Sequence, residues 1–289
     1  MTPSQLAAFR RAVLGAGDGA LRPLPWRATR DPWKVLVSEC MLQQTQAQRV
    51  VGPYCAFVRR FPTPAACARG PLADVLRLWS GLGYNRRAVQ LHAAARTMVE
   101  RHGGTVPDRI EELMALPGVG PYTARAVLAF AFELRVGVVD VNVRRVLARA
   151  VAGAPLTPAQ AQVVADRLVP ESRSWSWNQA MVEHGAMRCT ARAPQCSDCP
   201  LGRRCAWARS GHRQPDPWRP ATRQSSYEGS DRQGRGRLLA ALCGDAVRPW
   251  ALADACGWPG QHRRARRAAD TLVGDGLARW SPGGSLVLP

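Results

Sequence analysis

Four cysteines fall within one short stretch, "CTARAPQCSDCPLGRRC", at Cys189, Cys196, Cys199 and Cys205. Their spacing is C-x6-C-x2-C-x5-C. In a reducing compartment, thiols clustered in this way are expected to bind a metal rather than to form disulfides. Four thiolates suit a zinc ion and an iron–sulfur cluster equally well. The sequence therefore predicts a metal centre, and ligand chemistry alone leaves its metal open.

Two carboxylates stand in places where they could act on a substrate. Glu39 lies among apolar residues in "VSECMLQQTQ", on a predicted helix, and Asp140 ends the apolar run "VVD" where another helix begins. A buried glutamate has a raised pKa and can act as a general acid. A glutamate in such a helix more often lies on its surface, and an aspartate at a helix start is usually only an N-cap. Each residue is a weak candidate when it is taken alone.

The stretch "LPGVGPYTARAV" joins two predicted helices through a turn that contains no ionisable side chain. Gly118 and Gly120 permit positive φ angles and close approach by another backbone. The N–H groups of the turn, including that of Val119, precede a helix N-terminus and form a site for a phosphate oxygen. Such a contact ignores base sequence. The pattern is that of a helix-hairpin-helix, with an ordinary turn between helices as the alternative.

The formal net charge is +19, and all but one of the 40 basic residues are arginine; the exception is Lys34. Compositional drift explains arginine over lysine, but it does not explain the excess of base over acid. A charge this large predicts a polyanionic partner, most often nucleic acid. No apolar run is long enough for a transmembrane helix, and the first residues lack the apolar core of a signal peptide. We expect a cytoplasmic, nucleoid-associated protein.

Residues 33–208 are predicted to be mostly helical, with helices over 71–84, 86–104 and 107–116, and no strand pattern precedes residue 230. Residues 211–237 combine Pro, Gly, Ser and Arg and are predicted to form a linker. Residues 238–289 suggest three short helices and two strands around a Pro-Gly-Gly turn, a small winged-helix-like module. Its third helix carries arginines that either face DNA or are solvated: Arg263, Arg264, Arg266 and Arg267. The remaining cysteines are predicted to be small core residues: Cys40, Cys55, Cys67, Cys243 and Cys256.

Taken together and in order, these segments resemble the endonuclease III (helix-hairpin-helix) superfamily, and most closely its MutY-type adenine DNA glycosylases. The resemblance runs from about Leu24 to Cys205 and rests on "LPWR", "SECMLQQTQ", "LWSGLGYNRRA", "LPGVGPYTARAV", "VVDVNVRRVLAR", "WNQAMVEHGAMRC" and the cysteine spacing. It implies an all-α fold of two subdomains. Residues 29–132 would form a six-helix subdomain with the hairpin, and residues 1–28 and 133–210 a second subdomain. The cysteines there would hold a 4Fe–4S cluster.

The resemblance also implies roles for individual residues. A glycosylase flips its target base out of the duplex. Glu39 would protonate that base, and Asp140 would stabilise the oxocarbenium-like sugar, a division of labour like that of glycoside hydrolases. Tyr122 and Asn142 match positions that support these two groups. The matches in the base pocket are Trp26, Arg27 and Glu183. Gln43, Gln44 and Tyr84 match positions that insert into the duplex and probe the opposite base. Arg192, Arg203 and Arg204 lie among the cysteines, so we expect this loop to touch phosphates.

Relatives that cleave the strand carry a nucleophilic lysine at the position of Tyr122. Tyrosine there implies a one-step hydrolase without Schiff-base lyase activity. We expect a monomer that acts on duplex DNA containing mismatched or oxidised base pairs. Tyrosine at this position also occurs in a related group of thymine mismatch glycosylases, so a thymine or uracil mismatch glycosylase is an alternative. Glu39 and Asp140 together argue against a third reading, a non-catalytic iron–sulfur DNA-binding protein, and the pocket residues favour adenine.

Two features depart from the family pattern. Many adenine glycosylases of this type have a large C-terminal domain that recognises 8-oxoguanine, and residues 238–289 are too few to form it. We therefore expect excision of adenine opposite both 8-oxoguanine and guanine, with weaker discrimination between the two. Val141 stands where a small or polar residue is more usual, and nothing in the sequence explains it.

Overall fold

The computed structural model describes residues 1–211, 213, 215–218 and 226–289. The fold is mostly helical, as predicted, and no strand precedes residue 230 in the described part of the chain. Its contacts group into two compact units. The first unit comprises residues 1–35, 108–111 and 120–222, and the second comprises residues 36–107, 112–119 and 223–289. None of the described helices is both long enough and apolar enough to cross a bilayer.

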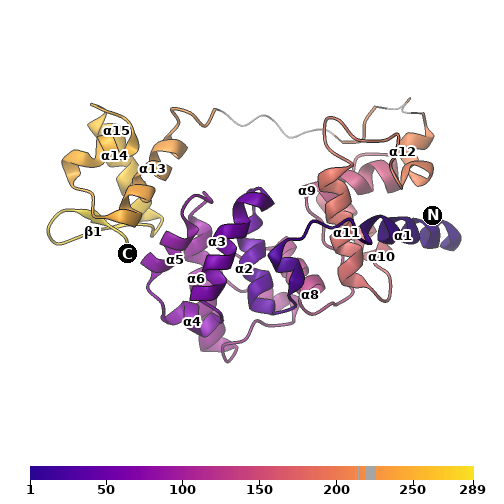
Figure 1. Cartoon of the computed structure of the whole chain (residues 1–289), viewed down its shortest axis with the longest axis horizontal. Helices are drawn as coiled ribbons and strands as arrows, with labels where there is room; N and C mark the ends of the chain where they lie inside the picture. The colour runs from indigo at the N-terminus through magenta and orange to yellow at the C-terminus, as the bar shows by residue number, and fades with distance from the viewer. Residues whose placement is uncertain (212, 214, 219–225) are drawn as a thin grey trace. The chain divides into compact units, whose positions relative to one another are not determined.

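The first unit is built from helices at both ends of its sequence range (Figure 1). These are α1 (Pro3–Gly17), η1 (Pro25–Ala28), α8 (Pro121–Phe130), α9 (Val141–Val146), η2 (Leu147–Ala152), α10 (Pro158–Leu168), α11 (Ser174–Met187), η3 (Gly202–Arg204) and α12 (Ala206–Arg209). Helix α1 packs on α11. The Phe9 and Trp177 rings meet edge to face at 6.2 Å. A Cβ on Gly17 would lie 2.6 Å from that of Ala180, so glycine permits this close packing.

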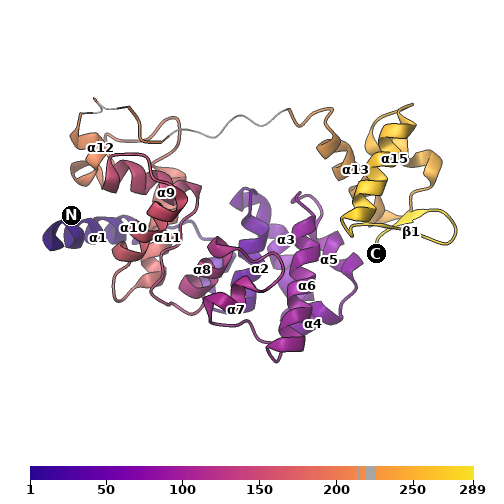
Figure 2. The ribbon, with the colours of Figure 1, turned by 180° about the vertical axis from the view of Figure 1, so that it is seen from behind.

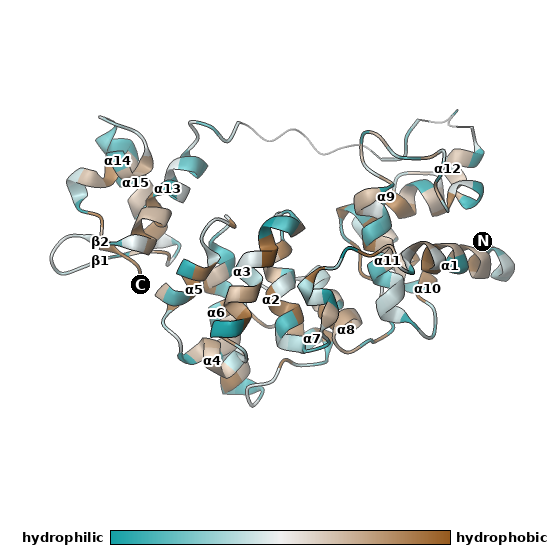
Figure 3. Ribbon diagram, in the orientation of Figure 1, coloured by the Kyte–Doolittle hydropathy of each residue, from teal (hydrophilic) through white to brown (hydrophobic). Residues whose placement is uncertain are grey.

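The second unit contains the remaining helices, which Figure 2 shows from behind. Helices α2 (Pro32–Leu42) and α7 (Ile110–Met114) each begin in the first unit and continue into the second. The others near them are α3 (Ala47–Arg60), α4 (Pro64–Arg69), α5 (Leu72–Trp79) and α6 (Arg86–Arg101). Many of these helices carry both hydrophobic and hydrophilic residues, as Figure 3 shows for α5 and α6.

The core of the second unit follows the amphipathic stripes of its helices. Val75, Leu76 and Trp79 of α5 are buried, as their spacing predicts. Val99, which is next to the buried Met98 on α6, is 43% exposed and lies off the stripe that buries its neighbour. The predicted core cysteines divide: Cys40, Cys67 and Cys256 are buried, whereas Cys55 and Cys243 are half-buried.

The turn before α8 shows one of its two glycines in a special conformation. Gly118 has a φ of +76°, and a Cβ there would lie 2.7 Å from the Cβ of Gln90 on α6. A side chain at residue 118 would therefore be strained and would clash. Gly120 differs from the expectation: its φ is −93°, it precedes α8 as N-cap residue, and a Cβ would meet open space. The close approach that was expected of both glycines belongs to Gly118.

The C-terminal part of the second unit has three α-helices and one short 3-10 helix, followed by a hairpin. The elements are α13 (Asp231–Gly244), η4 (Pro249–Ala251), α14 (Leu252–Cys256), α15 (His262–Gly274), β1 (Arg279–Trp280) and β2 (Leu286–Val287). The strands are antiparallel, with Trp280 opposite Leu286. Arg264 of α15 lies over the Trp258 ring and pairs with Asp231, so it belongs to the packing of this module.

The predicted linker is partly structured. Helix α13 begins at Asp231, inside the range 211–237, and Asp216 and Trp218 contact the rest of the first unit, as described below. Residues 212, 214 and 219–225 of the predicted linker lie outside the described residues. The winged-helix-like character of the module and the division into a six-helix and a cluster subdomain stay predictions; α8, which was assigned to the six-helix subdomain, groups with the first unit.

Candidate active site and cysteine loop

Asp140 caps helix α9 and is fixed by two hydrogen bonds. The backbone N–H of Val143 donates to Asp140 Oδ1 at 2.6 Å, and the side-chain amide of Asn142 donates to Oδ2 at 2.8 Å. Burial raises the pKa of Asp140 above its ordinary value, although both hydrogen bonds and the positive charge of Arg145 oppose that rise. The carboxylate is thus held in one orientation in a partly dehydrated place, where its charge acts strongly on a nearby cation.

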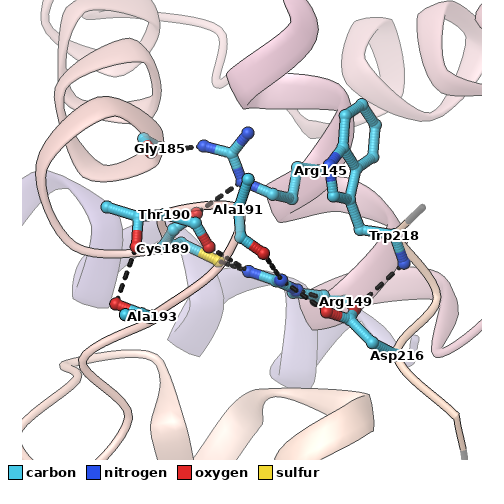
Figure 4. Close-up of polar contacts among 9 residues, drawn as sticks. All are labelled: Arg145, Arg149, Gly185, Cys189, Thr190, Ala191, Ala193, Asp216 and Trp218. Carbon is cyan, nitrogen blue, oxygen red and sulfur yellow. Dashed lines mark hydrogen bonds and ion pairs between the residues drawn. The ribbon is translucent and has the colours of Figure 1, made fainter. Parts of the chain in front are cut away.

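A buried arginine links the support of Asp140 to the cysteine loop. Arg145 is 4% exposed, and its Nη2 donates to Asn142 Oδ1 at 2.9 Å and to the carbonyl of Gly185 at 2.8 Å. Its Nε donates to the carbonyl of Cys189 at 2.6 Å. Figure 4 shows Arg145 between Gly185 and Cys189. One side chain therefore connects the first cysteine of the loop to the residue that orients Asp140.

A second carboxylate of the first unit is held by two arginines. Glu183 on α11 is 6% exposed. Arg22 Nε donates to Glu183 Oε1 at 2.7 Å, and Arg27 Nη2 donates to Oε2 at 2.8 Å. Burial by itself would raise the pKa of Glu183, but these two arginines outweigh it and lower that pKa. The predicted neighbours Arg27 and Glu183 are brought together, and Trp26 in η1 is buried beside Arg27 in the chain. Glu183 is therefore an ionised acceptor.

Glu39 and the predicted DNA-probing residues belong to the second unit. Glu39 is 5% exposed on α2, between buried Ser38 and Cys40, so it is a core glutamate rather than a surface one. Gln44 is exposed, and the side chain of Tyr84 is 48% exposed. Tyr122 is half-buried in the first turn of α8, in the first unit with Asp140.

The four clustered cysteines line a single cavity, with apolar walls that include Val146, Ala150 and Leu201. Burial raises the pKa of Cys199 and of Cys205, and the neighbouring cysteines raise each further. In the part of the chain that the structure describes, no three His, Cys, Asp or Glu side chains are grouped closely enough to hold a metal ion. The donor set nevertheless fits a thiolate-bound cluster, because all four cysteines line the same cavity.

A buried guanidinium lies against this loop (Figure 4). The side chain of Arg149 is 1% exposed. Its Nη1 donates to the carbonyl of Thr190 at 2.7 Å and approaches Cys189 Sγ at 3.5 Å, and its Nη2 donates to the carbonyl of Ala191 at 3.1 Å. Asp216 completes the arrangement with bonds from Arg149 Nε at 2.9 Å and from Nη2 at 2.5 Å. Arg149 and Asp216 thereby fasten the start of the cysteine loop.

Sequence reasoning missed the arginines of these networks. Arg22 lies in none of the quoted motifs, and Asp216 lies in a segment that was predicted to be a linker. Arg145 and Arg149 do lie in the quoted segment "VVDVNVRRVLAR", five and nine residues after Asp140, but only Asp140 and Asn142 of that segment were given roles. Arg192, Arg203 and Arg204 of the cysteine loop are exposed, which leaves them accessible to a polyanion.

Comparison with known proteins identifies the family of the chain. Residues 37–170 match the HhH-GPD superfamily of base excision DNA repair proteins. The adenine DNA glycosylase of Mycobacterium tuberculosis strain CDC 1551 / Oshkosh is 46% identical over 275 residues, covering 93% of this chain and 89% of the relative. That of Mycolicibacterium smegmatis is 42% identical over 94% of this chain and 92% of its own length. The human adenine DNA glycosylase is 41% identical over 70% of this chain and 40% of its own length.

Solved structures show the same fold. A thermostable thymine-DNA glycosylase superposes with a TM-score of 0.69 at 29% identity, covering 72% of this chain and all but 1% of its own. Endonuclease III in a trapped covalent DNA intermediate superposes with a TM-score of 0.64 at 24% identity, over 74% of this chain. The helical fold of the endonuclease III-like proteins is thus confirmed. The chain belongs to the adenine DNA glycosylases of the HhH-GPD superfamily of base excision repair proteins.

Proposed function

We propose that this protein hydrolyses the N-glycosidic bond of adenine mispaired with 8-oxoguanine or guanine in duplex DNA. Adenine leaves poorly unless it is protonated, and the departing sugar develops positive charge. Glu39 supplies the proton to the flipped base, and Asp140 offsets the charge at C1′. The observation that supports this assignment most strongly is Asp140 itself, a half-buried carboxylate whose two oxygens are both oriented by hydrogen bonds.

The pocket residues supply recognition of the base. The ionised Glu183, held by Arg22 and Arg27, is an acceptor that suits the exocyclic amino group of adenine. Thymine offers a carbonyl oxygen at the corresponding edge, which an ionised carboxylate repels. Trp26, which precedes Arg27 in the chain, is a buried indole that would add apolar contact with the base. These residues favour adenine over the thymine or uracil of the alternative function.

Contacts to DNA are proposed for three groups of residues. The backbone of Gly118, Val119 and Gly120 binds a phosphate without reading sequence. Arg192 of the cysteine loop contacts another phosphate. The residues proposed to enter the duplex and probe the opposite base are Gln43, Gln44 and Tyr84. The protein is proposed to act on DNA as a monomer.

The cysteine loop is proposed to hold a 4Fe–4S cluster through Cys189, Cys196, Cys199 and Cys205. When bound, the cluster would cross-link the loop and supply a redox-active iron centre. Arg149 and Arg145 bind the backbone at the start of the loop. Arg145 also binds Asn142, which orients Asp140, so a shift of the loop would disturb the support of Asp140. Purified without oxygen, the protein should contain about four irons per chain. Stoichiometric zinc without iron, in protein from iron-replete cells, would contradict the assignment.

The experiment that tests the proposal is Glu39→Gln on a duplex with adenine opposite 8-oxoguanine. Glutamine keeps the shape and the hydrogen-bonding capacity of the side chain but cannot supply the proton. The variant should bind this duplex as tightly as the wild type and release adenine about a hundredfold to ten-thousandfold more slowly in a single turnover. Undiminished release by Glu39→Gln would remove the proposed acid.

The proposed hydrolase leaves the abasic strand intact. Tyr122 is not an amine, and the lone lysine, Lys34, is engaged with Asp31 at 3.5 Å. Borohydride added during turnover should trap almost no covalent adduct, and the product strand should break only after alkali is added. Efficient trapping that disappears in Lys34→Ala would show that this lysine acts as a nucleophile.

A further inference from the structure

Two of the residues proposed to enter DNA have strained backbones. Gln44 has a φ of 55° and Tyr84 has a φ of 48°, both in the left-handed region. Only four non-glycine residues in the described part of the chain have positive φ, and these are two of them. Such conformations cost energy and persist only where the surrounding structure holds them. The question is which group holds these two segments in place.

The first segment is held by a single buried arginine on α6. Arg87 is 8% exposed. Its Nη1 donates to the carbonyls of Cys40 at 2.7 Å, Met41 at 2.9 Å and Gln43 at 2.7 Å. Its Nη2 donates to Thr45 Oγ1 at 3.1 Å. These bonds span the end of α2 and the turn after it, on both sides of Gln44.

The same guanidinium holds the second segment. Arg87 Nη2 also donates to the carbonyl of Gly83 at 2.9 Å, and Nε donates to the carbonyl of Tyr84 at 3.2 Å. The rings of Tyr84 and Trp79 each lie 5.5 Å from the guanidinium carbon. Every hydrogen bond of this side chain therefore goes to one of the two segments, and a planar fork of five N–H donors is what such an arrangement needs.

Two further contacts join the segments directly. Thr45 Oγ1 donates to the carbonyl of Leu82 at 3.3 Å. Arg49 Nη2 donates to the carbonyl of Gly81 at 2.6 Å. Both contacts, like those of Arg87, lie within the second unit. The two segments are thus bound to each other, with Arg87 as the buried centre of the assembly.

We propose that Arg87 is a positioning residue for recognition of the base opposite adenine. It holds Gln43, Gln44 and Tyr84 as one preformed unit before DNA binds, so that no ordering is needed at the moment of insertion. This inference rests on the proposed function, in which these three residues probe the duplex. Arg87 itself touches backbone and rings and contacts no reacting atom.

The test compares Arg87→Lys with Arg86→Lys. Lysine at residue 87 keeps the charge but presents its donors from one atom, which cannot reach both segments. Arg86 is the matched control, because its side chain is 69% exposed and its ion pair with Asp275 is long, at 3.6 Å. Each variant is titrated with a duplex holding a non-hydrolysable adenosine analogue opposite 8-oxoguanine, and with an undamaged duplex of the same length.

Arg87→Lys should weaken binding to the mispaired duplex by about tenfold or more and change binding to the undamaged duplex by less than about twofold. Contacts to bases carry selectivity, whereas contacts to phosphates carry general affinity. Arg86→Lys should leave both affinities unchanged. If Arg87→Lys weakens binding to both duplexes by the same factor, so that the ratio of the two affinities is unchanged, the inference is overturned. A purely structural role would lower thermal stability without changing that ratio.

Thr45→Val keeps the test decisive if Arg87→Lys does not fold. This variant removes one bond to Arg87 and the bond to Leu82, and it should lower the same selectivity by a smaller factor. Unchanged selectivity in Thr45→Val would then overturn the inference. A wild-type protein that releases no adenine from any duplex contradicts the proposed function. If the wild type is active and the variants at Arg87 and Thr45 keep its preference for the mispaired duplex, only the role of Arg87 is contradicted.

Discussion

Asp216→Asn should loosen the cysteine loop, and the structure sets the size of the effect. The partner of Asp216, Arg149, has a side chain that is 1% exposed, and its three other side-chain hydrogen bonds all go to the start of the loop. Asparagine has nearly the same shape but leaves the buried guanidinium without its counter-charge. Removing one partner of a fully buried ion pair costs about 3–5 kcal/mol.

The cost here is smaller because solvent reaches the carboxylate. The side chain of Asp216 is 31% exposed, and an asparagine oxygen can still accept one of the two bonds from Arg149. Losing one charge-assisted hydrogen bond costs about 1.5–3 kcal/mol before screening, so we expect about 1–2 kcal/mol. For a chain of this size that corresponds to a fall in Tm of roughly 2–8 °C. Iron should also be lost faster to a chelator.

The pH dependence of stability is a second test of the ion pair between Asp216 and Arg149. Burial alone would raise the pKa of Asp216, but the bonds from Arg149 and from the Trp218 N–H hold it below its ordinary value of 3.8. The carboxylate therefore stabilises the fold above pH 3.8, and this contribution disappears as the pH falls below that value. The difference in Tm between the wild type and Asp216→Asn should shrink accordingly.

The assay is thermal unfolding followed by circular dichroism, together with the rate of iron loss to excess chelator. Asp198→Asn is the matched control, because Asp198 lies in the same loop, is 68% exposed and pairs with the exposed Arg188. It should unfold and lose iron as the wild type does. If Asp216→Asn behaves like Asp198→Asn, then Asp216 does not fasten the loop.

Three further predictions concern the proposed site. Gln44→Gly should be more stable to unfolding than Gln44→Ala by about 1 kcal/mol, and should therefore have the higher Tm, because glycine adopts the φ of 55° freely. Equal Tm values would mean that no strain is stored there. Glu183→Gln should weaken binding of the adenine-containing mispair and lower stability by about 1–3 kcal/mol, because two arginines lose their counter-charge; unchanged kcat/KM and Tm would contradict this. The single-turnover rate should fall with acid at a midpoint above 3.8, because burial raises the pKa of Asp140; a rate that stays flat down to that pH would show that its ionisation is not needed.

Local pattern was enough to predict the helical fold, the C-terminal hairpin and the family. Val75, Leu76 and Trp79 form the stripe that their spacing predicts, and the four thiols line one cavity. Gly118 has the positive φ that its turn suggested, whereas Gly120 does not, because a glycine before a helix can equally serve as an ordinary extended N-cap residue. These features depend on neighbours in the sequence.

The buried arginines could not be predicted. Arg87, Arg145 and Arg149 each bind backbone carbonyls of segments far away in the sequence, and no periodicity marks such partners. Arginine is normally exposed, and in a chain with a formal net charge of +19 a surface role is the natural expectation. Asp216 was missed for a different reason. It lies in a segment with the composition of a linker, yet it is the counter-ion of the buried Arg149. The roles of the proposed catalytic and DNA-probing residues remain predictions.

The most direct test of the account is the identity of the base that is released. Wild-type protein, at equal and saturating concentration, is reacted in single turnovers with duplexes containing A:8-oxoguanine, A:G, T:G or U:G. The predicted result is release of adenine from both of the first two duplexes and no release of thymine or uracil. Release of thymine or uracil without adenine, or no release from any duplex, would contradict it.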